Sequence, residues 1–589
     1  MERNTQLGSA GTARNAAAAL GFLAVFLAFS FAARASAQCS ADPQQVSRIH
    51  NSYAQHNWAN VVRLAADLPC RPADANFEYG MALAHLQRLP EARAALAEGR
   101  RQSRGAAQER FDVELAGIAF ERKRNPEAAM WLRRALKLDP KDEYANNFAG
   151  TVYFLLGNVQ AALKYWNRIQ KPYVAELRFD PQLRIRRLLL DRSFVFAPAS
   201  VLHQPDYLAT QARLDALNLF PTYTIALNAL PDSNSGPSFN ADFHAVERDR
   251  FGSNRAQALL STFGGAFYET IYPSYFNIGR SAINFESLLR WDSQKYRAWL
   301  SLSGPVRTFP QFRWSFSTDE RDENWTMRRS FSGNAPPLGS LNLQRETFAG
   351  SFAAIPNGRL KWSFGAELSH RSYGHIVYGT ALTPTLVTSG FELKQLASVS
   401  YKLLDVSERR FWLTTDASSE EGRLWSSSSG SSSRFFEKLQ GSALAHWFPQ
   451  AADDRYEFQE QLRAGRTFGS APFDEIFMLG VERDNDLWLR GHIGTRDRQK
   501  GSAPLGYNYF LANSDFYRRI YSNGLFDLQA GPLLDIARMG APTSGLSSPQ
   551  WLFDGGVEAK LSVLGVKVVL TYGRDLRNGP NAVYGTLAK

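Results

Sequence analysis

The stretch at residues 360–371, "LKWSFGAELSHR", alternates apolar and polar side chains over its first ten positions. This alternation predicts a β-strand with one apolar and one polar face, because successive side chains in a strand point to opposite sides. The stretches "AINFESLLRW" (282–291) and "LGVKVVLTYGR" (564–574) repeat the pattern. From about residue 250 to 589 the chain consists of such segments, which predicts a large antiparallel sheet.

Two architectures can use this sheet, a soluble β-sandwich and a transmembrane β-barrel. Aromatic residues gather at the strand ends, and loops such as 418–434, "SSEEGRLWSSSSGSSSR", are long and polar. Strands of about ten alternating residues with aromatic ends are typical of outer-membrane barrels, in which closure satisfies every backbone hydrogen bond. We therefore expect residues 250–589 to form a barrel of about 16 strands, with the sandwich as the alternative.

The first 37 residues have the three parts of a secretory signal peptide. Arg3 and Arg14 precede an apolar run over residues 16–33, and residues 35–37 form an A-x-A cleavage site. A permanent membrane anchor is the alternative interpretation. Export places the rest of the chain in an oxidising compartment, where Cys39 and Cys70 would form a disulfide across a predicted helical hairpin. Two free thiols are the alternative.

Composition and motifs point away from catalysis. The net charge is +11 and forms no block of like charge, so nucleic acid is not an expected partner. The sequence contains no metalloprotease, phosphate-loop, Rossmann or hydrolase motif. Its nine histidines are scattered without metal-ligand spacing, and Asp484-Asn485-Asp486 lacks the glycine and distal glutamate of a calcium loop. We expect no enzyme activity, no cofactor and no metal.

Residues 38–175 carry a helical repeat. Small residues recur at Gly80, Ala116 and Ala149, at intervals of 36 and 33. Each is followed at fixed offsets by a second small and a third larger residue, and these are Ala92, Ala128 and Ala161, then Leu96, Leu132 and Tyr165. The spacing resembles that of tetratricopeptide repeats (TPRs), which implies a periplasmic protein partner bound on a concave surface. A plain helical bundle is the alternative.

Residues 178–248 have a mixed pattern. Early alternation in "LRIRRLLL" (183–190), helical spacing at 206–220 and two alternating stretches at 222–230 and 238–248 predict the order β-α-β-β, with a further helical turn near residues 200–204. The segment "RLDALNLFPTYTIAL" (213–227) resembles the second helix and strand of a POTRA domain. Such modules can pair a client strand with a free sheet edge.

The segment "FMLGVERDNDLWLRGH" (477–492) and the strands after it resemble the bacterial surface antigen superfamily of BamA, TamA and the two-partner secretion translocators (TpsB). Leu489, Arg490 and Gly491 match the tip of the loop that folds into the barrel lumen, with His492 at the position of the usual aromatic. "GPLLDIAR" (531–538) resembles the strand that supplies the lumen acid, Asp535, and "NSDFYRR" (513–519) supplies Asp515. Asp527 shares a strand face with Asp535 and is a further lumen candidate.

The resemblance implies a protein of the bacterial outer membrane that inserts or translocates client polypeptides, with its N-terminal modules in the periplasm and its barrel among outer-membrane lipids. Arg490 would then be buried against Asp535, because a guanidinium inside a barrel is costly unless it is paired. The alternative is an exposed loop arginine. At the level of function, a passive or polysaccharide-export pore with a TPR docking domain and a purely structural barrel are the alternatives.

Overall fold

The computed structural model describes residues 41–230, 238–328, 337–379, 382–427, 433–523, 526–540, 550–563, 566–577, 579 and 581–588. The expected signal peptide and Cys39 lie outside these residues. The chain divides into two compact units, with the boundary between residues 145 and 146, and each unit is described by itself.

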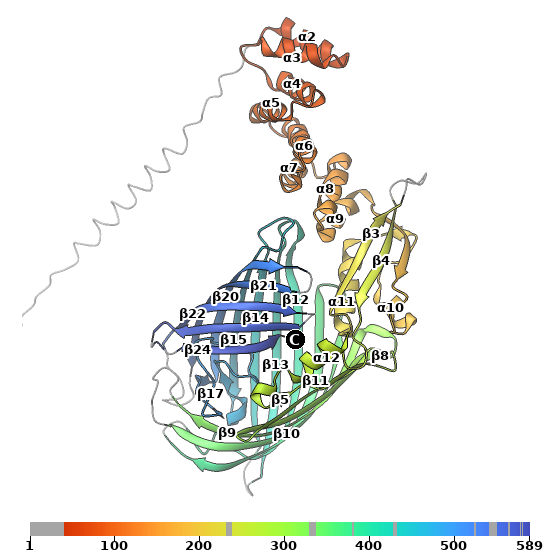
Figure 1. Cartoon of the computed structure of the whole chain (residues 1–589). Helices are drawn as coiled ribbons and strands as arrows, with labels where there is room; N and C mark the ends of the chain where they lie inside the picture. The colour runs from red at the N-terminus through yellow and green to blue at the C-terminus, as the bar shows by residue number, and fades with distance from the viewer. Residues whose placement is uncertain are drawn as a thin grey trace, which may run out of the picture. The chain divides into compact units, whose positions relative to one another are not determined.

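The first unit consists of helices that pack in consecutive pairs (Figure 1). Their bounds are α2 (Pro43–Ala54), α3 (Trp58–Ala66), α4 (Ala73–His85), α5 (Leu89–Gln102), α6 (Ala106–Glu121) and α7 (Asn125–Leu138). Gly80 allows α4 and α5 to approach closely, since a Cβ atom there would lie 2.6 Å from Cγ of Leu96. Ala92, Ala116 and Ala128 are fully buried. The small residues of the repeat therefore lie in the core between paired helices.

Helix α8 (Glu143–Leu155) crosses the boundary into the second unit and is followed by α9 (Val159–Trp166). The Asn158 side chain caps α9 by accepting a hydrogen bond from the Ala161 backbone N–H. Gly150 repeats the close approach, because a Cβ atom at this position would overlap the Trp166 ring. Ala149, Ala161 and Tyr165 are buried, as the repeat spacing predicts.

A four-stranded sheet follows, in the order β2-β1-β4-β3. The elements are β1 (Tyr173–Phe179), α10 (Arg187–Ser193), β2 (Ser200–Val201), α11 (Gln204–Leu217), β3 (Thr222–Ala229) and β4 (Ser238–Val246). Two predictions are wrong here. The stretch 183–190 is no strand, because α10 begins at Arg187 and the first strand ends at Phe179; its alternating start reflects a short connection. The expected turn near residues 200–204 contains strand β2.

All but two of the remaining strands in the described residues form one large antiparallel sheet with a barrel-like fold, which we call the barrel sheet (Figure 1). Its strands are β5 (Thr270–Ile271), β6 (Ser274–Ile278), β7 (Ile283–Asp292), β8 (Lys295–Val306), β9 (Phe309–Met327), β10 (Gly339–Ala354), β11 (Leu360–Val377), β12 (Gly390–Val406), β13 (Phe411–Ser426), β14 (Arg434–Trp447), β15 (Tyr456–Gly469), β17 (Thr495–Arg496), β18 (Gln499–Lys500), β20 (Asn508–Ser522), β21 (Phe526–Gly540), β22 (Leu552–Val563), β23 (Val566–Asp575) and β24 (Asn581–Ala588). In the described residues the sheet has 18 strands, and 16 of them, the number expected, remain when the short strands β17 and β18 are set apart. The short strands β17 and β18 belong to an inserted loop, since β15 pairs directly with β20.

The two faces of the barrel sheet have opposite chemistry. On β11, Phe364 and Leu368 are 56% and 50% exposed, whereas Ser369 and Arg371 on the other face are buried. A soluble protein buries its apolar face, so this arrangement is inverted. Apolar side chains point outward and polar side chains point inward, which is the pattern of a sheet whose outer face meets lipid.

Candidate functional site

The loop between β15 and β20 makes most of its contacts on the inner, polar face of the barrel sheet. Besides β17 and β18 it contains the short helix η4 (Phe473–Glu475) and a two-stranded sheet of β16 (Phe477–Met478) and β19 (Leu505–Gly506). Its charged residues bond to strands on several sides of the sheet, as set out below. The loop therefore lies inside the barrel sheet, and its tip is at Leu489–His492.

The strand register aligns four polar side chains in a row on the inner face of the barrel sheet, where the loop tip lies. Across four neighbouring strands, Asn513 on β20 pairs with Asp535 on β21, Asp535 with Asp554 on β22, and Asp554 with Asp575 on β23. Residues directly opposite each other in an antiparallel sheet have their Cβ atoms about 5 Å apart on one face. The three aspartates are fully buried. This acidic row, Asn513-Asp535-Asp554-Asp575, receives the tip of the loop.

Arg490 is tied to the row by several hydrogen bonds. Its Nε and Nη2 donate to Oδ1 of Asp535 at 3.0 and 2.6 Å, and its backbone N–H donates to Oδ2 at 2.8 Å. Nη1 donates to Oδ1 of Asp515 at 2.5 Å and lies 3.6 Å from Oε2 of Glu558. The guanidinium is therefore buried and paired, and charge-assisted bonds of this kind fix orientation as well as position. The structure brings Arg490, Asp535 and Asp515 together.

Gly491 and Gly573 let the loop tip touch β23. A Cβ atom on Gly491 would lie 2.6 Å from the backbone nitrogen of Asp575, and one on Gly573 would lie 2.1 Å from the carbonyl oxygen of Arg490. In both cases the obstacle is backbone, which cannot swing away. The Gly491 backbone N–H also donates to Asp554. Each larger residue would push the tip off the acidic row.

Leu489 anchors the tip by burial. It is fully buried in a cluster with Phe477, Leu479, Tyr509 and Leu511, so one side of the loop packs against β20. Full burial of a leucine side chain contributes about 1.5–3 kcal/mol. Asp527, by contrast, does not join the site. It lies at the far end of β21, where its carboxylate pairs with Nε of Arg519 at 3.0 Å. Asp527 and Asp535 share a strand face, but they are eight positions apart along β21, so Asp527 is too far along the strand to reach the loop tip.

Asp484 forms a second attachment of the loop, on another part of the barrel sheet. Its carboxylate accepts from Arg290 on β7 at 2.8 Å, from Arg297 on β8 at 2.5 Å and from Lys500 within the loop at 2.8 Å. The sequence singles out Asp484 only as part of a weak calcium pattern. Nothing local signals its role, since its cationic partners on the strands are more than 180 positions away.

A third attachment lies at η4. Asp474 accepts from Arg345 on β10 at 2.9 Å and from Arg371 on β11 at 2.7 Å. The neighbouring Glu475 accepts from Lys394 on β12 at 3.1 Å and from Lys438 on β14 at 3.3 Å. These four basic side chains point inward, away from the face of the sheet that carries the exposed apolar side chains. No sequence pattern marked Asp474 or Glu475 as a residue of this site, although the two are adjacent acids before the apolar segment 476–480.

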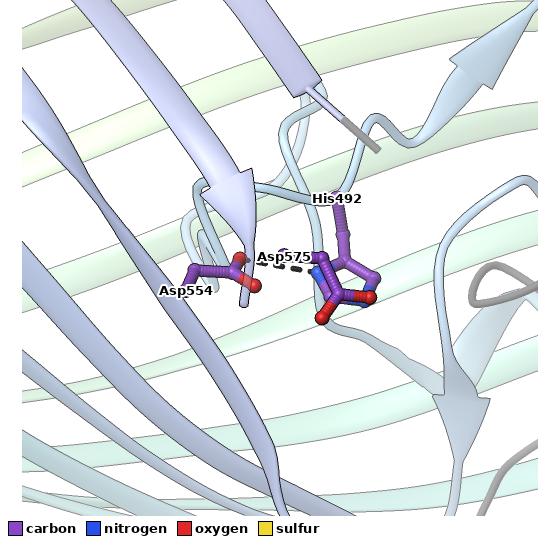
Figure 2. Close-up of side chains that lie close together, drawn as sticks. All are labelled: His492, Asp554 and Asp575. Atoms are coloured by element: carbon purple, nitrogen blue, oxygen red, sulfur yellow. Dashed lines mark hydrogen bonds and ion pairs between the residues drawn. The ribbon is translucent and has the colours of Figure 1, made fainter. Parts of the chain in front are cut away.

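His492 lies against two aspartates of the acidic row, although the spacing of the histidines along the sequence suggested no such cluster (Figure 2). Its side chain is buried, with only 2% of the residue exposed. Its Nδ1 is 3.1 Å from Oδ2 of Asp554, and its Nε2 is 3.6 Å from Oδ2 of Asp575. Nε2 is buried without a hydrogen-bond partner among the described residues. The partners are 62 and 83 positions away, so sequence spacing could not reveal this group.

Two further features bear on the sequence predictions. Cys70 is in a disulfide, while Cys39 lies outside the described residues. Within the part of the chain that the structure covers, no helix has the length and apolar character needed to cross a membrane.

Comparison with known proteins gives structural relatives only. No family model matches the chain, and no curated protein matches it. The chain is similar in fold to CdiB and BamA. CdiB from Escherichia coli superposes with a TM-score of 0.45 at 14% identity, over 71% of this chain and 75% of CdiB. BamA from Haemophilus ducreyi lacking POTRA domains 1–3 gives 0.39 at 10% identity, over 71% and 84%. CdiB from Acinetobacter baumannii gives 0.39 at 11%, over 71% and 73%.

Proposed function

We propose that this chain is an outer-membrane barrel protein that inserts polypeptides into that membrane or translocates them across it. The observation that carries the proposal is the placement of Arg490. The tip of a long loop, with the sequence Leu-Arg-Gly, holds this arginine on Asp535 inside the barrel sheet. The resemblance of the loop and of the two following strands to the surface antigen superfamily implies this arrangement.

The inverted faces of the barrel sheet support a location in the membrane. Large apolar side chains on the long strands are exposed, among them Phe348, Phe364, Phe391, Val557 and Leu570. A soluble protein rarely exposes a contiguous apolar surface of this extent. With lipid as the solvent of the outer face, the same side chains are favourably placed and the backbone is satisfied by strand pairing.

The modules before the barrel sheet suit the reception of a client. Strand β3 pairs with β4 on one side, and in the described residues no strand pairs with its other side. A free edge presents unpaired N–H and C=O groups to which an extended polypeptide can add as a further strand. We assign the POTRA-like role to residues 173–246. The paired helices before it would bind a periplasmic protein partner as a TPR-like array.

The three attachments of the loop favour this function over a passive or polysaccharide-export pore. Arg490, Asp484 and Asp474 each bind different strands, so the loop is held across the interior of the barrel sheet. Fixed side chains in this position would obstruct a permanently open channel. They suit a lumen that is closed until a client is engaged.

Depletion of the protein, followed by quantitative proteomics of the outer membrane and of the culture medium, tests the proposal. We expect a fall in outer-membrane barrel proteins if the chain inserts clients, or in a secreted polypeptide if it translocates them. Loss of surface polysaccharide with an unchanged proteome would contradict the proposal. The protein itself should fractionate with the outer membrane and migrate faster on gels when unheated. Recovery as a soluble periplasmic protein would refute the membrane assignment.

Removal of residues 173–246 tests the reception module separately. A chain without this module should still show heat-modifiable migration, because none of the strands of the barrel sheet is removed. Client levels should nevertheless fall as in depletion. Normal client levels in this variant would leave the module without the proposed role.

A further inference from the structure

We infer that His492 and Asp575, with Asp554 orienting the imidazole, form a binding site for one divalent transition-metal ion, which fastens the loop tip to β23. This inference goes beyond the proposed function, because polypeptide transport does not require a metal. The three residues each offer one donor atom, and these atoms lie within 4.8 Å of one another (Figure 2). All three side chains are fully buried.

The hydrogen bonds assign a role to each ring nitrogen of His492. Nδ1 lies 3.1 Å from Oδ2 of Asp554, so it carries the proton and donates to that carboxylate. The lone pair of the neutral ring is then on Nε2. Nε2 has no hydrogen-bond partner in the described structure and faces the carboxylate oxygen of Asp575 at 3.6 Å. Two electron-rich atoms therefore face each other in a buried site.

A metal ion resolves this contact better than a proton does. At 3.6 Å, Nε2 and Oδ2 of Asp575 are too far apart for a hydrogen bond, so a proton on Nε2 would remain unsatisfied. Two ligands that bind one ion at about 2.0–2.2 Å lie roughly 3.0–3.6 Å apart. The observed separation is at the upper end of this range. Asp554 accepts from Nδ1–H on the opposite side of the imidazole ring, so it orients His492 and does not bind the ion itself.

The charges around the loop tip point in the same direction. Three carboxylates, those of Asp515, Asp535 and Glu558, share the single guanidinium of Arg490. The next carboxylate in the row, Asp554, faces the imidazole of His492. Buried carboxylates are costly unless cations compensate them. A divalent cation beside His492 would supply the missing positive charge.

The donor set selects the class of metal. Carboxylates alone suit Mg²⁺ or Ca²⁺, whereas an imidazole nitrogen shifts the preference to ions such as Zn²⁺. The hydrogen bond from Nδ1–H to Asp554 is the kind of contact that orients a metal-binding histidine. We therefore assign the site to Zn²⁺ or a similar transition-metal ion, with His492 bound through Nε2.

Metal analysis of the purified full-length protein in detergent tests the site. After chelation and dialysis, we expect the protein to take up one Zn²⁺ per chain, measured by mass spectrometry of the metal, and not to replace it with Mg²⁺ or Ca²⁺. His492→Ala and Asp575→Asn should each weaken Zn²⁺ binding at least about tenfold. The matched control is His446→Ala, because His446, a partly buried histidine on β14, faces one carboxylate, that of Glu457, instead of two. This variant should bind Zn²⁺ like the parent chain.

A second measurement does not depend on a variant folding. Chelation of the parent chain should make the segment 479–507 more sensitive to protease, and Zn²⁺ should restore its resistance. Absence of stoichiometric Zn²⁺ from the parent chain would overturn the inference, and so would binding that survives His492→Ala or that Mg²⁺ displaces. If the protease resistance of segment 479–507 does not change on chelation, the ion does not hold the loop tip in place.

Discussion

Asp535 on β21 and Asp554 on β22 lie directly opposite each other in the strand register, and the loop tip covers them in chain order. Arg490 bonds to Asp535, the Gly491 backbone N–H bonds to Asp554, and His492 extends the contact toward Asp575. Three consecutive loop residues thus match consecutive positions of the acidic row. Because each loop residue has its own partner in the row, single substitutions can remove the contacts of the tip one at a time.

Removal of the Arg490–Asp535 pair should release the loop tip. Arg490→Ala and Asp535→Ala each leave a buried charge with fewer partners, which costs about 3–5 kcal/mol. Each variant should lose the proposed client handling, and limited proteolysis should cut within residues 479–507. The double variant should be little worse than either single one, because both remove the same contact. Arg496→Ala, an exposed arginine of the same loop, is the control, and an equal effect there would argue against a specific role for Arg490.

Asp484→Asn should weaken the second attachment of the loop without changing its volume. The substitution removes the negative charge that Arg290, Arg297 and Lys500 share. We expect a loss of about 3 kcal/mol, visible as a lower temperature for the gel shift from the folded to the unfolded form. Asp486→Asn changes an exposed aspartate two positions away and should leave that temperature unchanged. Equal temperatures for the Asp484 variant and the parent would mean that the loop is held elsewhere.

Gly573→Ala should displace the loop tip by steric overlap alone. The added methyl group would lie 2.1 Å from the carbonyl oxygen of Arg490, so the loop tip or β23 must move. Overpacking of this kind costs about 1–3 kcal/mol, and the protease sensitivity of the loop should resemble that of Arg490→Ala. For comparison, Gly441→Ala places a methyl group on β14 with its nearest contact at 3.7 Å. If the two alanine variants behave alike, the close approach of the tip to β23 is not required.

The two cysteines should form one intramolecular disulfide in the mature protein. We predict that non-reducing mass analysis finds Cys39 joined to Cys70 and no dimer. Closure of a loop of this length stabilises the helical hairpin by about 3 kcal/mol in the chain-entropy description. Alkylation of both thiols in the native protein would contradict the prediction.

Local patterns predicted many strands of the barrel sheet, but they failed in short connections and at 418–426, which was expected to be a loop and belongs to β13. The alternation at 360–371 lies within β11, and that at 282–291 coincides with β7 apart from Ala282, because a long two-faced strand repeats its signal many times. The alternation at 183–190 is short and belongs partly to α10. A few residues with period two favour a strand only weakly, and the burial of Leu189 and Leu190 in helix α10 stabilises the helix instead.

Within the site, the sequence indicated Leu489, Arg490, Gly491, Asp515 and Asp535 through the resemblance of the loop and the following strands. It did not indicate Asp484, Asp554 or Asp575 as partners of the loop. Asp527 was a reasonable candidate on strand periodicity, yet its position along β21 carries it to Arg519. Asp484, Asp554 and Asp575 carry no local signal, since their partners come from other strands and from the loop. Histidine spacing along the chain likewise argued against the group that includes His492.

By itself the sequence determined the two-faced strands, the helical repeat and the loop motif, because each depends on residues a few positions apart. Only the tertiary structure decided which carboxylates meet the loop tip. Strand register aligns Asp535, Asp554 and Asp575 although about 20 residues separate each from the next, and the loop then crosses the interior to reach them. That alignment results from the pairing of whole strands, so no short stretch of sequence contains it.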